Sequence, residues 1–468
     1  MTTDIENRAD DVEPPVEPWR IKVVERMRLP SRQEREAQLQ AAHFSIFKVP
    51  SSAIFIDLLT DSGTSAMSDQ QWAGLMLGDE SYAGARGFFH FEQTVQDMSG
   101  YPHVIPTHQG RAAENMLYST LVERGTVVPG SNHFDTSRAH IEVNGGKAMD
   151  LAVAEARDPE SDHPFKGNID VERLRAVLQG EARGNIPLVT MTLTNNLSGG
   201  QPASLANIRE VSELCRSEGV PFFLDACRFA ENAFFIQQRE EGQGDRTVAE
   251  IALEVFGLAD GCTVSAKKDG LVNIGGFVAC RDERLAKAIK QRLILVEGFP
   301  TYGGLAGRDL EAMARGLQEV VDEDYLRFRV GQVAYFGQAL IEQGVEVMKP
   351  FGGHAIYLNA GRLLPHIPPT SFPGLATVAE LYREAGVRVA EFGTAMLGLV
   401  DAEGAPIPAP VEWVRLCVPR RVYTNSQLGY VAKALGRIRA RGPAVRGLRI
   451  VDKEPGPLGH FTARYEEI

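Results

Sequence analysis

Apolar and polar positions alternate between strand-like and helix-like patterns through the middle of the chain. Leu188–Leu193 is a short run with β-branched residues, Ala203–Glu218 carries apolar residues at helical spacing, and Phe222–Leu224 is the next apolar run. A strand, a helix and a strand of these lengths form a βαβ unit. The same alternation continues from about residue 100 to residue 280, so the pattern predicts a mostly parallel sheet that is covered by helices.

The pattern changes in the last third of the chain. From Leu310 to about Gln343 the apolar residues fall on one helical face, which predicts a long helical stretch between a large domain and a smaller one. Beyond it, strand-like runs at Ala355–Leu358 and Val414–Val418 alternate with helical segments. This mixture predicts a small α+β domain.

Composition and charge narrow the class of protein. The chain has 468 residues, of which 44% are hydrophobic, and a net charge of -12. The negative charge argues against non-specific nucleic-acid binding, which needs a basic face. The five cysteines show no CxxC spacing, and no apolar run approaches the ~20 residues of a membrane span. The acidic, proline-containing segment Met1–Trp19 is not a signal peptide. We therefore expect a cytoplasmic globular protein.

Two adjacent lysines, Lys267 and Lys268, directly follow the apolar run Cys262–Val264. A glycine-rich return that includes Gly270 and Gly275 comes next. A solvated lysine pair on the surface is the alternative interpretation. However, a lysine at a strand end beside a glycine loop is well placed to form a Schiff base with a carbonyl cofactor.

An aspartate, Asp225, ends the apolar run that starts at Phe222. A carboxylate there can pair with a protonated pyridine nitrogen and keep the ring electron-poor. Alternatively, Asp225 could cap the next helix. An acidic strand end about forty residues before a strand-end lysine is the order expected of a pyridoxal 5'-phosphate (PLP) enzyme with the aminotransferase-like fold.

Two further segments carry candidate binding chemistry. Thr107–Arg111 opens a predicted helix, and backbone N–H groups at a helix start, with Gly110 allowing close approach, can hold a phosphate. Ser265 could add a hydroxyl to the same phosphate. Arg415, inside a predicted strand, suits a bidentate grip on a carboxylate, although an arginine paired with a core acid is an equal alternative.

These motifs identify a family. The chain resembles the tryptophanase and tyrosine phenol-lyase family from about residue 18 to residue 468. The matching stretches are Ile56–Thr64 (IDLLTDSGT), Gly78–Gly84 (GDESYAG), Pro106–Arg111 (PTHQGR), Gly199–Pro202 (GGQP), Ser265–Asp269 (SAKKD), Glu297–Gly304 (EGFPTYGG) and His460–Arg464 (HFTAR). The resemblance implies a PLP enzyme of fold type I that removes the side chain of an aromatic amino acid. It also implies a disordered lead-in at 1–18, an N-terminal arm at 19–62 that packs with the small domain, a PLP-binding large domain at 63–320 and a small C-terminal domain at 321–468.

The resemblance also implies roles for single residues. Lys268 would hold the cofactor and act as the general base. The other implied cofactor contacts are Gln109, Gly110, Arg111 and Ser265 around the phosphate, Phe134 stacked on the ring, Asn196 at the phenolic oxygen, Asp225 at the pyridine nitrogen, and Arg228 beside the cofactor. On the substrate side, Arg415 and Thr60 would bind the carboxylate, and Tyr82 would protonate the leaving ring.

Family members are potassium-activated homotetramers. The resemblance places the potassium ion at Glu80 and the carbonyl groups of Gly63 and Asn273. It also implies that a neighbouring subunit completes each active site, where Tyr302 would contribute.

Three positions bear on which ring leaves. Expelling phenol builds negative charge on an oxygen, whereas expelling indole needs an apolar slot and an acceptor for one ring N–H. Tyrosine phenol-lyases resemble one another in having arginine, threonine and phenylalanine where this chain has Phe392, Asp135 and His460. All three differences favour tryptophan as substrate, with Asp135 and His460 as a pair. Gly270 and Cys227 depart from both branches, a difference that could loosen the cofactor site.

Other functions remain as alternatives. Cleavage of tyrosine, or of a sulfur-bearing amino acid, would use the same scaffold. A non-catalytic PLP-binding protein would lack the lysine or the aspartate, and both are present. A nucleotide-binding oxidoreductase would carry a GxGxxG run after its first strand, and the sequence has none there.

Overall fold

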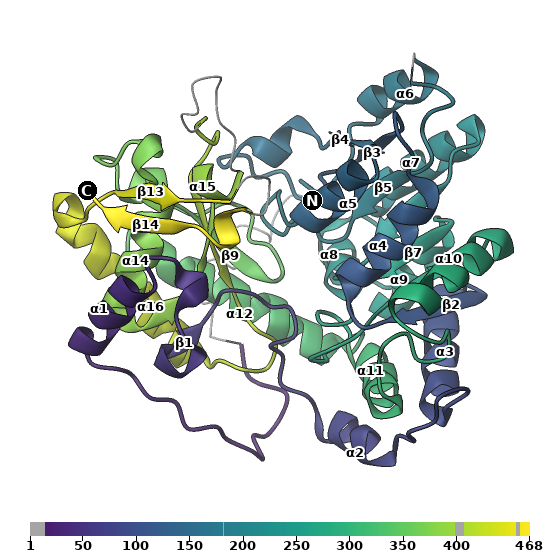
Figure 1. The fold of residues 1–468 in the computed structure, drawn as a ribbon, viewed down its shortest axis with the longest axis horizontal. Coiled ribbons are helices and arrows are strands. Elements are labelled where there is room, and N and C mark those ends of the chain that lie inside the picture. Colours follow the sequence, from purple (N-terminus) through teal and green to yellow (C-terminus); the bar gives the residue numbers. More distant parts are fainter. Residues whose placement is uncertain (1–14, 181, 398–406, 455–458) are drawn as a thin grey trace, which may run out of the picture. The chain divides into compact units, whose positions relative to one another are not determined.

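The computed structural model describes residues 15–180, 182–397, 407–454 and 459–468 (Figure 1). Most of the predicted disordered lead-in, residues 1–14, lies outside the described residues. The chain forms two compact units. Unit 1 consists of Met1–Thr60, Arg327–Val418 and Tyr423–Ile468, and unit 2 consists of Asp61–Leu326 and Pro419–Val422. No helix of the described ranges is long and apolar enough to cross a membrane.

A seven-stranded sheet forms the centre of unit 2. Its order is β2 (His103–Thr107), β8 (Gly276–Cys280), β7 (Gly261–Val264), β6 (Phe222–Asp225), β5 (Val189–Thr192), β3 (Val127–Gly130) and β4 (Lys147–Asp150). The neighbours from β7 to β4 pair in parallel, and β8 runs antiparallel to both β2 and β7. The prediction of a mostly parallel sheet is therefore confirmed.

Helices cover this sheet (Figure 1). They are α3 (Arg86–Ser99), α4 (Gly110–Leu121), α5 (Asp135–Val143), α6 (Val171–Gln179), α7 (Leu205–Glu218), α8 (Phe229–Arg239), α9 (Val248–Gly257), α10 (Glu283–Val296) and α11 (Gly307–Glu319), whereas α2 (Asp69–Leu77) packs on α11. Helices α4 and α10 pack together and bury an apolar cluster with Ile105 and Val278 of the sheet. Because parallel strands are covered on both faces, their sequences are largely apolar, as in Phe222–Leu224 of β6 before the terminal Asp225.

The helix predicted at Ala203–Glu218 shows why the local sequence folds as it does. The Ser204 hydroxyl accepts a hydrogen bond from the Asn207 N–H (3.1 Å) and begins α7. Gly219, with φ of 69°, ends the helix in the left-handed conformation that glycine adopts without strain. The strand–helix–strand unit of β5, α7 and β6 is thus the predicted βαβ unit.

Unit 1 is an α+β structure, as predicted. Its antiparallel sheet has the order β11 (Ala390–Phe392), β12 (Trp413–Cys417) and β9 (Ala355–Asn359). Helix α14 (Pro373–Ala385) packs against β11, β12 and helix α16 (Asn425–Arg441), while α1 (Arg32–Ala41) packs on α14. Two small pairs complete the unit: β1 (Ile56–Asp57) with β10 (Val387–Arg388), and β13 (Leu448–Asp452) with β14 (Arg464–Glu467).

The long helical stretch expected from Leu310 to Gln343 is two helices. Helix α11 ends at Glu319, and α12 spans Glu323–Glu342. The side chain of Asp322 accepts a hydrogen bond from the N–H of Tyr325 (2.8 Å). An aspartate directly before the first helical residue caps the start of a helix, so α12 begins here as a new helix. The apolar spacing alone indicates that one helix continues through this point.

Candidate active site

The carboxyl ends of β6 and β7 bring together the two residues with the strongest sequence signals. Asp225 is the last residue of β6 and pairs in register with Thr263 of β7. Lys268 lies in the turn after β7, where its N–H donates to the Ser265 carbonyl (3.2 Å) and its own carbonyl accepts from the Leu271 N–H (2.9 Å). This edge is where parallel α/β sheets bind ligands.

Asp225 does not cap the next helix. The N-cap position of α8 is Arg228, whose side chain makes no capping hydrogen bond. Asp225 instead accepts a hydrogen bond from the thiol of Cys227 (Sγ to Oδ1, 2.8 Å). Burial, followed by the charge of Asp225, raises the pKa of this thiol, so Cys227 stays protonated and donates.

Cys227 also joins the loops that follow the two strands. Its sulfur accepts from the N–H of Ser265 (3.2 Å), and its carbonyl accepts from the N–H of Asp269 (3.3 Å). Cys227 thus connects the loop that follows Asp225 to the turn that carries Lys268.

Gln109 and Gly110, two of the residues predicted to hold a phosphate, lie at the start of α4. Gln109 occupies the N-cap position without a side-chain capping bond, so its side chain leaves the helix start open to an anion. A Cβ atom on residue 110 would lie 2.4 Å from the Cβ of Ser265, so only glycine allows the helix start to approach the serine this closely. Burial and the nearby cations Lys268 and Arg111 lower the pKa of Lys267. A helix start, a hydroxyl and these cations fit the phosphate of a pyridine cofactor.

Glu114 is a residue that the sequence did not single out. It lies on α4, one turn after Gly110, and accepts a hydrogen bond from the Ser137 hydroxyl. Burial and then the charge of Asp225 raise the pKa of Glu114 to about 7. In the sequence, Glu114 stands out only as an acidic residue between two apolar positions of α4, Ala113 and Leu117, both of which are buried.

Phe134, Asp135 and Asn196 lie at the same edge of the sheet. Phe134 and Asp135 begin α5 in the segment after β3, and the buried Asn196 follows β5. These segments are joined by a hydrogen bond from the Asn132 amide to the Ser198 hydroxyl (2.8 Å). Parallel strands thus deliver Phe134, Asn196, Asp225 and Lys268 to one edge.

The predicted cation ligands are only partly brought together. The Asn273 side chain donates to the carbonyl groups of Gly63 (3.0 Å) and Ser65 (3.2 Å), so Gly63 and Asn273 are neighbours. Glu80 is exposed and forms an ion pair with Arg308 (2.8 Å).

The side chain of Arg228, predicted beside the cofactor, donates two hydrogen bonds to Asp61 (2.9 and 2.8 Å).

Tyr82 and Tyr302 lie side by side in unit 2. Their ring centroids are 5.5 Å apart, and the ring of Phe299 lies 5.6 Å from Tyr82. Tyr82 is 72% exposed. A hydrogen bond with Tyr302 raises the pKa of Tyr82 above that of a free tyrosine.

The remaining predicted residues belong to unit 1. Arg415 of β12 lies over the ring of Phe392 of β11, with its guanidinium carbon 4.1 Å from the ring centroid. The same side chain donates to the carbonyl of Leu59 (3.3 Å), the residue before Thr60. His460 is buried in a short helical turn, and its ring packs on Phe461 (4.0 Å between centroids) and Phe47 (6.2 Å).

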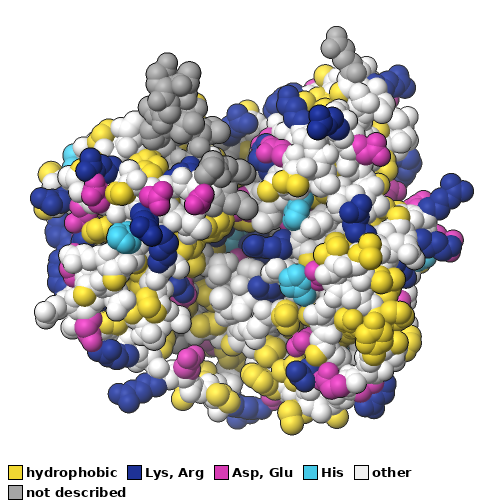
Figure 2. Space-filling view, viewed as in Figure 1, with side chains coloured by type: hydrophobic (Ala, Val, Ile, Leu, Met, Phe, Trp, Pro, Cys, Tyr) yellow, Lys and Arg dark blue, Asp and Glu magenta, His cyan; other side chains and the backbone are white. Residues whose placement is uncertain are grey.

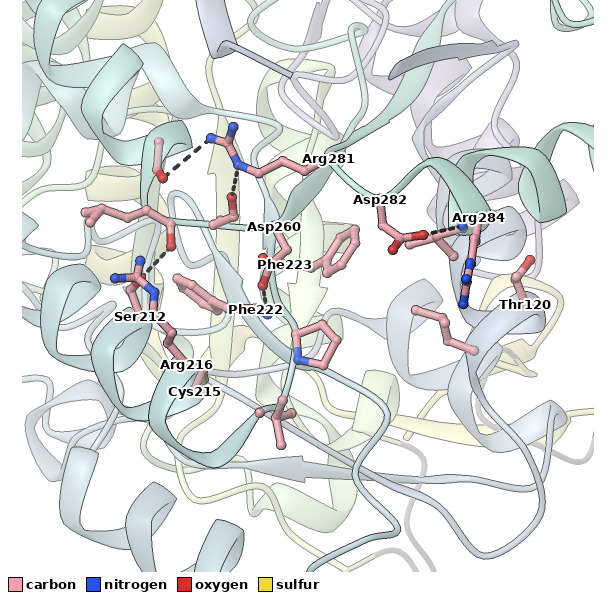
Figure 3. Close-up of a pocket in the computed structure, with 18 of the residues that line it drawn as sticks. Thr120, Ser212, Cys215, Arg216, Phe222, Phe223, Asp260, Arg281, Asp282 and Arg284 are labelled. Carbon is pink, nitrogen blue, oxygen red and sulfur yellow. Dashed lines mark hydrogen bonds between the residues drawn. The ribbon is translucent and has the colours of Figure 1, made fainter. Parts of the chain in front are cut away.

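A cavity of about 870 Å³ opens at the opposite edge of the unit 2 sheet (Figure 3). Phe222 and Phe223, the first residues of β6, line it together with Asp260, Arg281 and Arg284. None of the predicted site residues lines this cavity. The strand-end residues predicted for the site lie instead at the carboxyl edge of the sheet.

Comparisons with known proteins show which family the chain is similar to. Residues 57–434 match the family model described as "Beta-eliminating lyase". The tryptophanase of Hyphomonas neptunium is 52% identical over 453 residues, covering 97% of this chain and 99% of that protein. The tryptophanase of Salinibacter ruber is 53% identical over 448 residues, covering 96% and 94%. The tyrosine phenol-lyase of Symbiobacterium sp. is 46% identical over 455 residues, covering 97% and 99%.

Solved structures with low sequence identity share the fold. The serine palmitoyltransferase of Sphingomonas wittichii aligns with a TM-score of 0.57 at 15% identity, covering 88% of this chain and 97% of that chain. The serine palmitoyltransferase of S. paucimobilis, with bound PLP-myriocin, aligns with a TM-score of 0.56 at 13% identity, covering 82% and 87%. The predicted aminotransferase-like α/β fold is thereby confirmed.

Proposed function

The chain belongs to the beta-eliminating lyase family, and on this basis we propose that it converts L-tryptophan into indole, pyruvate and ammonia with PLP as cofactor. We choose tryptophan over tyrosine as the substrate because the apolar ring of Phe392 lies beneath Arg415. At this position the other branch of the family has an arginine, which suits a phenolate-like leaving group. A phenylalanine supplies the apolar surface that an indole ring needs.

Lys268 and Asp225 have the central roles in the proposed reaction. PLP, when bound, supplies an electron sink for the bond that breaks. Lys268 would hold the cofactor, and once the substrate amine has displaced it, the freed Lys268 amine would remove the α-proton of the substrate. Asp225 pairs with the pyridine nitrogen, and the Cys227 thiol that donates to Asp225 orients this carboxylate. The cradle of Gly110, Arg111 and Ser265 holds the phosphate.

The substrate contacts are proposed as follows. Arg415 and Thr60 bind the carboxylate, and Phe392 lies against the leaving ring. Asp135 and His460 form the polar pair that the resemblance implies for the indole N–H. Tyr82 donates a proton to the ring carbon that leaves, because a tyrosine phenol is protonated near neutral pH and can act as a general acid.

The proposal includes three further properties implied by the family. A potassium ion bound by the carbonyls of Gly63 and Asn273 and by Glu80 activates the enzyme, and four identical chains form the active assembly. All five cysteines are free thiols, which fits a reducing compartment such as the cytoplasm.

Tyrosine phenol-lyase activity is the second candidate. The observation in its favour is that tyrosine phenol-lyases match this chain over the same length, at 46% identity. A PLP-binding protein without activity is the candidate from another class, and it requires no proton donor such as Tyr82.

The test is a product assay on the purified protein with PLP and potassium. We expect indole and pyruvate from L-tryptophan, little phenol from L-tyrosine, and no activity in Lys268→Ala. In Phe392→Arg we expect the ratio of kcat/KM for tryptophan to that for tyrosine to fall by at least roughly tenfold, since ring contacts of this kind contribute ~1–3 kcal/mol. Phenol as the main product of the wild type would refute the choice of tryptophan. A protein that binds PLP but releases no product would refute the lyase activity.

A further inference from the structure

Five charged side chains form one buried network in unit 2. Arg420 donates to Asp61 (2.9 Å), Glu231 (2.7 Å) and Asp269 (3.0 Å), and Arg228 donates two further hydrogen bonds to Asp61. None of the five residues is more than 3% exposed. Arg420 is thus the centre of the network, because three carboxylates share its guanidinium group.

The network ends directly at the predicted cofactor lysine. Asp269 follows Lys268 in the chain, and its two carboxylate oxygens have different partners. Oδ1 accepts from Arg420, while Oδ2 accepts from the N–H of Ala230 in the first turn of α8 (2.8 Å). The Asp269 N–H donates to the carbonyl of Cys227. Asp269 therefore attaches the turn that carries Lys268 to Arg420 and the start of α8 through its carboxylate, and to Cys227 through its N–H.

Arg420 reaches this turn from a distant part of the sequence. Pro419–Val422 belongs to unit 2, whereas the residues before and after it belong to unit 1. The Arg420 carbonyl also accepts from the N–H of Ala66, so both ends of the residue contact unit 2. This short segment brings the fully buried guanidinium group of Arg420 to Asp269, which lies 151 residues earlier in the chain.

The charges of the network show why the Asp269 carboxylate needs Arg420 beside it. Three carboxylates share two guanidinium groups, and removing one cation from such a buried group leaves uncompensated charge. Burial and the charge of Glu231 raise the pKa of Asp269, to about 7, whereas Arg420 lowers it. Without Arg420, Asp269 would lose both a hydrogen-bond donor and the charge that favours its carboxylate form.

We propose that Arg420 is a positioning residue for Lys268: it holds the Asp269 carboxylate, and Asp269 fixes the turn that aims the Lys268 amine. This inference rests on the proposed function, because it assigns the cofactor to Lys268. An amine displaced by about 1 Å loses proton-transfer rate by roughly 100-fold, although substrate binding through unit 1 residues is unchanged. Arg420 acts through Asp269 and does not itself touch the substrate.

The experiment compares Arg420→Lys and Asp269→Asn with a matched control, Arg383→Lys. Arg383 is also a buried arginine shared by three carboxylates, those of Glu36, Glu380 and Glu467, but it lies in unit 1 on α14. Asp269→Asn leaves two carboxylates for two arginines, so it makes the network neutral and favours folding even where Arg420→Lys does not fold. Each variant is measured for kcat and KM with L-tryptophan, the primary isotope effect with α-deuterated tryptophan, the absorbance of bound PLP, and the melting temperature.

We expect kcat to fall roughly 10- to 100-fold in Asp269→Asn and Arg420→Lys, with KM within about twofold and a larger isotope effect, because proton removal becomes slower. Arg383→Lys should lower only the melting temperature. The positioning role is refuted if both network variants bind PLP with wild-type absorbance and keep wild-type kcat and isotope effect, whatever their melting temperatures. If the wild type itself shows no PLP absorbance dependent on Lys268, the proposed function fails first, so the two failures are distinguishable.

Discussion

At the scale of single residues, Gly110 shows how a missing side chain shapes the candidate site. The helix start and Ser265 come together only because residue 110 has no Cβ. In Gly110→Ala we expect the dissociation constant of PLP to rise at least roughly tenfold, since the helix start must move away from the phosphate. A fluorescence titration of the apoprotein with PLP measures this change.

Gly257→Ala is the matched control for that substitution. Gly257 ends α9, and a Cβ atom there would have no other heavy atom within 4 Å. We expect its PLP affinity to equal that of the wild type. Equal affinity in Gly110→Ala would show that the start of α4 does not hold the phosphate.

The sequence located some of these residues and missed others for a physical reason. Asp225 and Lys268 stand at the ends of apolar runs, so the pattern alone puts them at the edge of a sheet. Glu114 and Arg420 give no such signal. Their importance comes from contacts with Asp225 and Asp269, which are far away in the chain and become neighbours only in the folded unit.

At the scale of elements, the junction between β11 and α15 (Thr394–Leu397) contains a buried pair of acids. The Glu391 carboxylate accepts hydrogen bonds from the N–H groups of Gly393 (2.8 Å), Ala395 (3.1 Å) and Met396 (2.9 Å), and so holds the start of the helix beside Phe392. Burial and then the charge of Glu412 raise the pKa of Glu391 to about 8. Glu412 in turn accepts from the Thr394 hydroxyl.

This junction predicts a pH dependence of stability. The pKa of Glu391 rises from 4.5 in the unfolded chain to about 8 in the folded one, so the folded chain binds more protons between these values. The contribution of Glu391 to the free energy of unfolding is therefore complete below pH 4.5 and is lost as the pH rises to about 8. We expect the melting temperature of the wild type, relative to Glu391→Gln, to decrease between pH 5 and pH 9. A constant difference across this range would show that Glu391 is ionised throughout.

Apolar spacing was sufficient to predict several central elements, and it missed one helix boundary for a clear reason. Strands β5, β6 and β7 and helix α7 lie where the runs of apolar residues indicated, because buried strands and amphipathic helices need those residues. The break between α11 and α12 escaped the same analysis. It depends on Asp322, a polar residue that caps a helix through one hydrogen bond and hardly changes the apolar pattern.

At the scale of the whole molecule, unit 2 exposes several large apolar side chains. Trp72, Met76 and Leu77 of α2 are 57%, 86% and 63% exposed, and Phe89 of α3 is 56% exposed. Figure 2 shows hydrophobic side chains gathered at the lower right, over the part of unit 2 that contains α2 and α3. Contiguous apolar surface of this kind marks protein interfaces, and Tyr82 lies in the segment between the two helices.

This surface supports the proposed tetramer and predicts how it can be broken. In the double variant Trp72→Glu with Met76→Glu, two charges would enter the interface, so we expect analytical ultracentrifugation to detect dimers or monomers in place of four chains. Activity per chain should fall in parallel, since Tyr302 is proposed to act on the active site of a neighbouring chain. Leu253→Glu is the control, because Leu253 is also exposed but lies on α9. A double variant that remains tetrameric would place the interface elsewhere, and one that dissociates with full activity would show that each chain holds a complete active site.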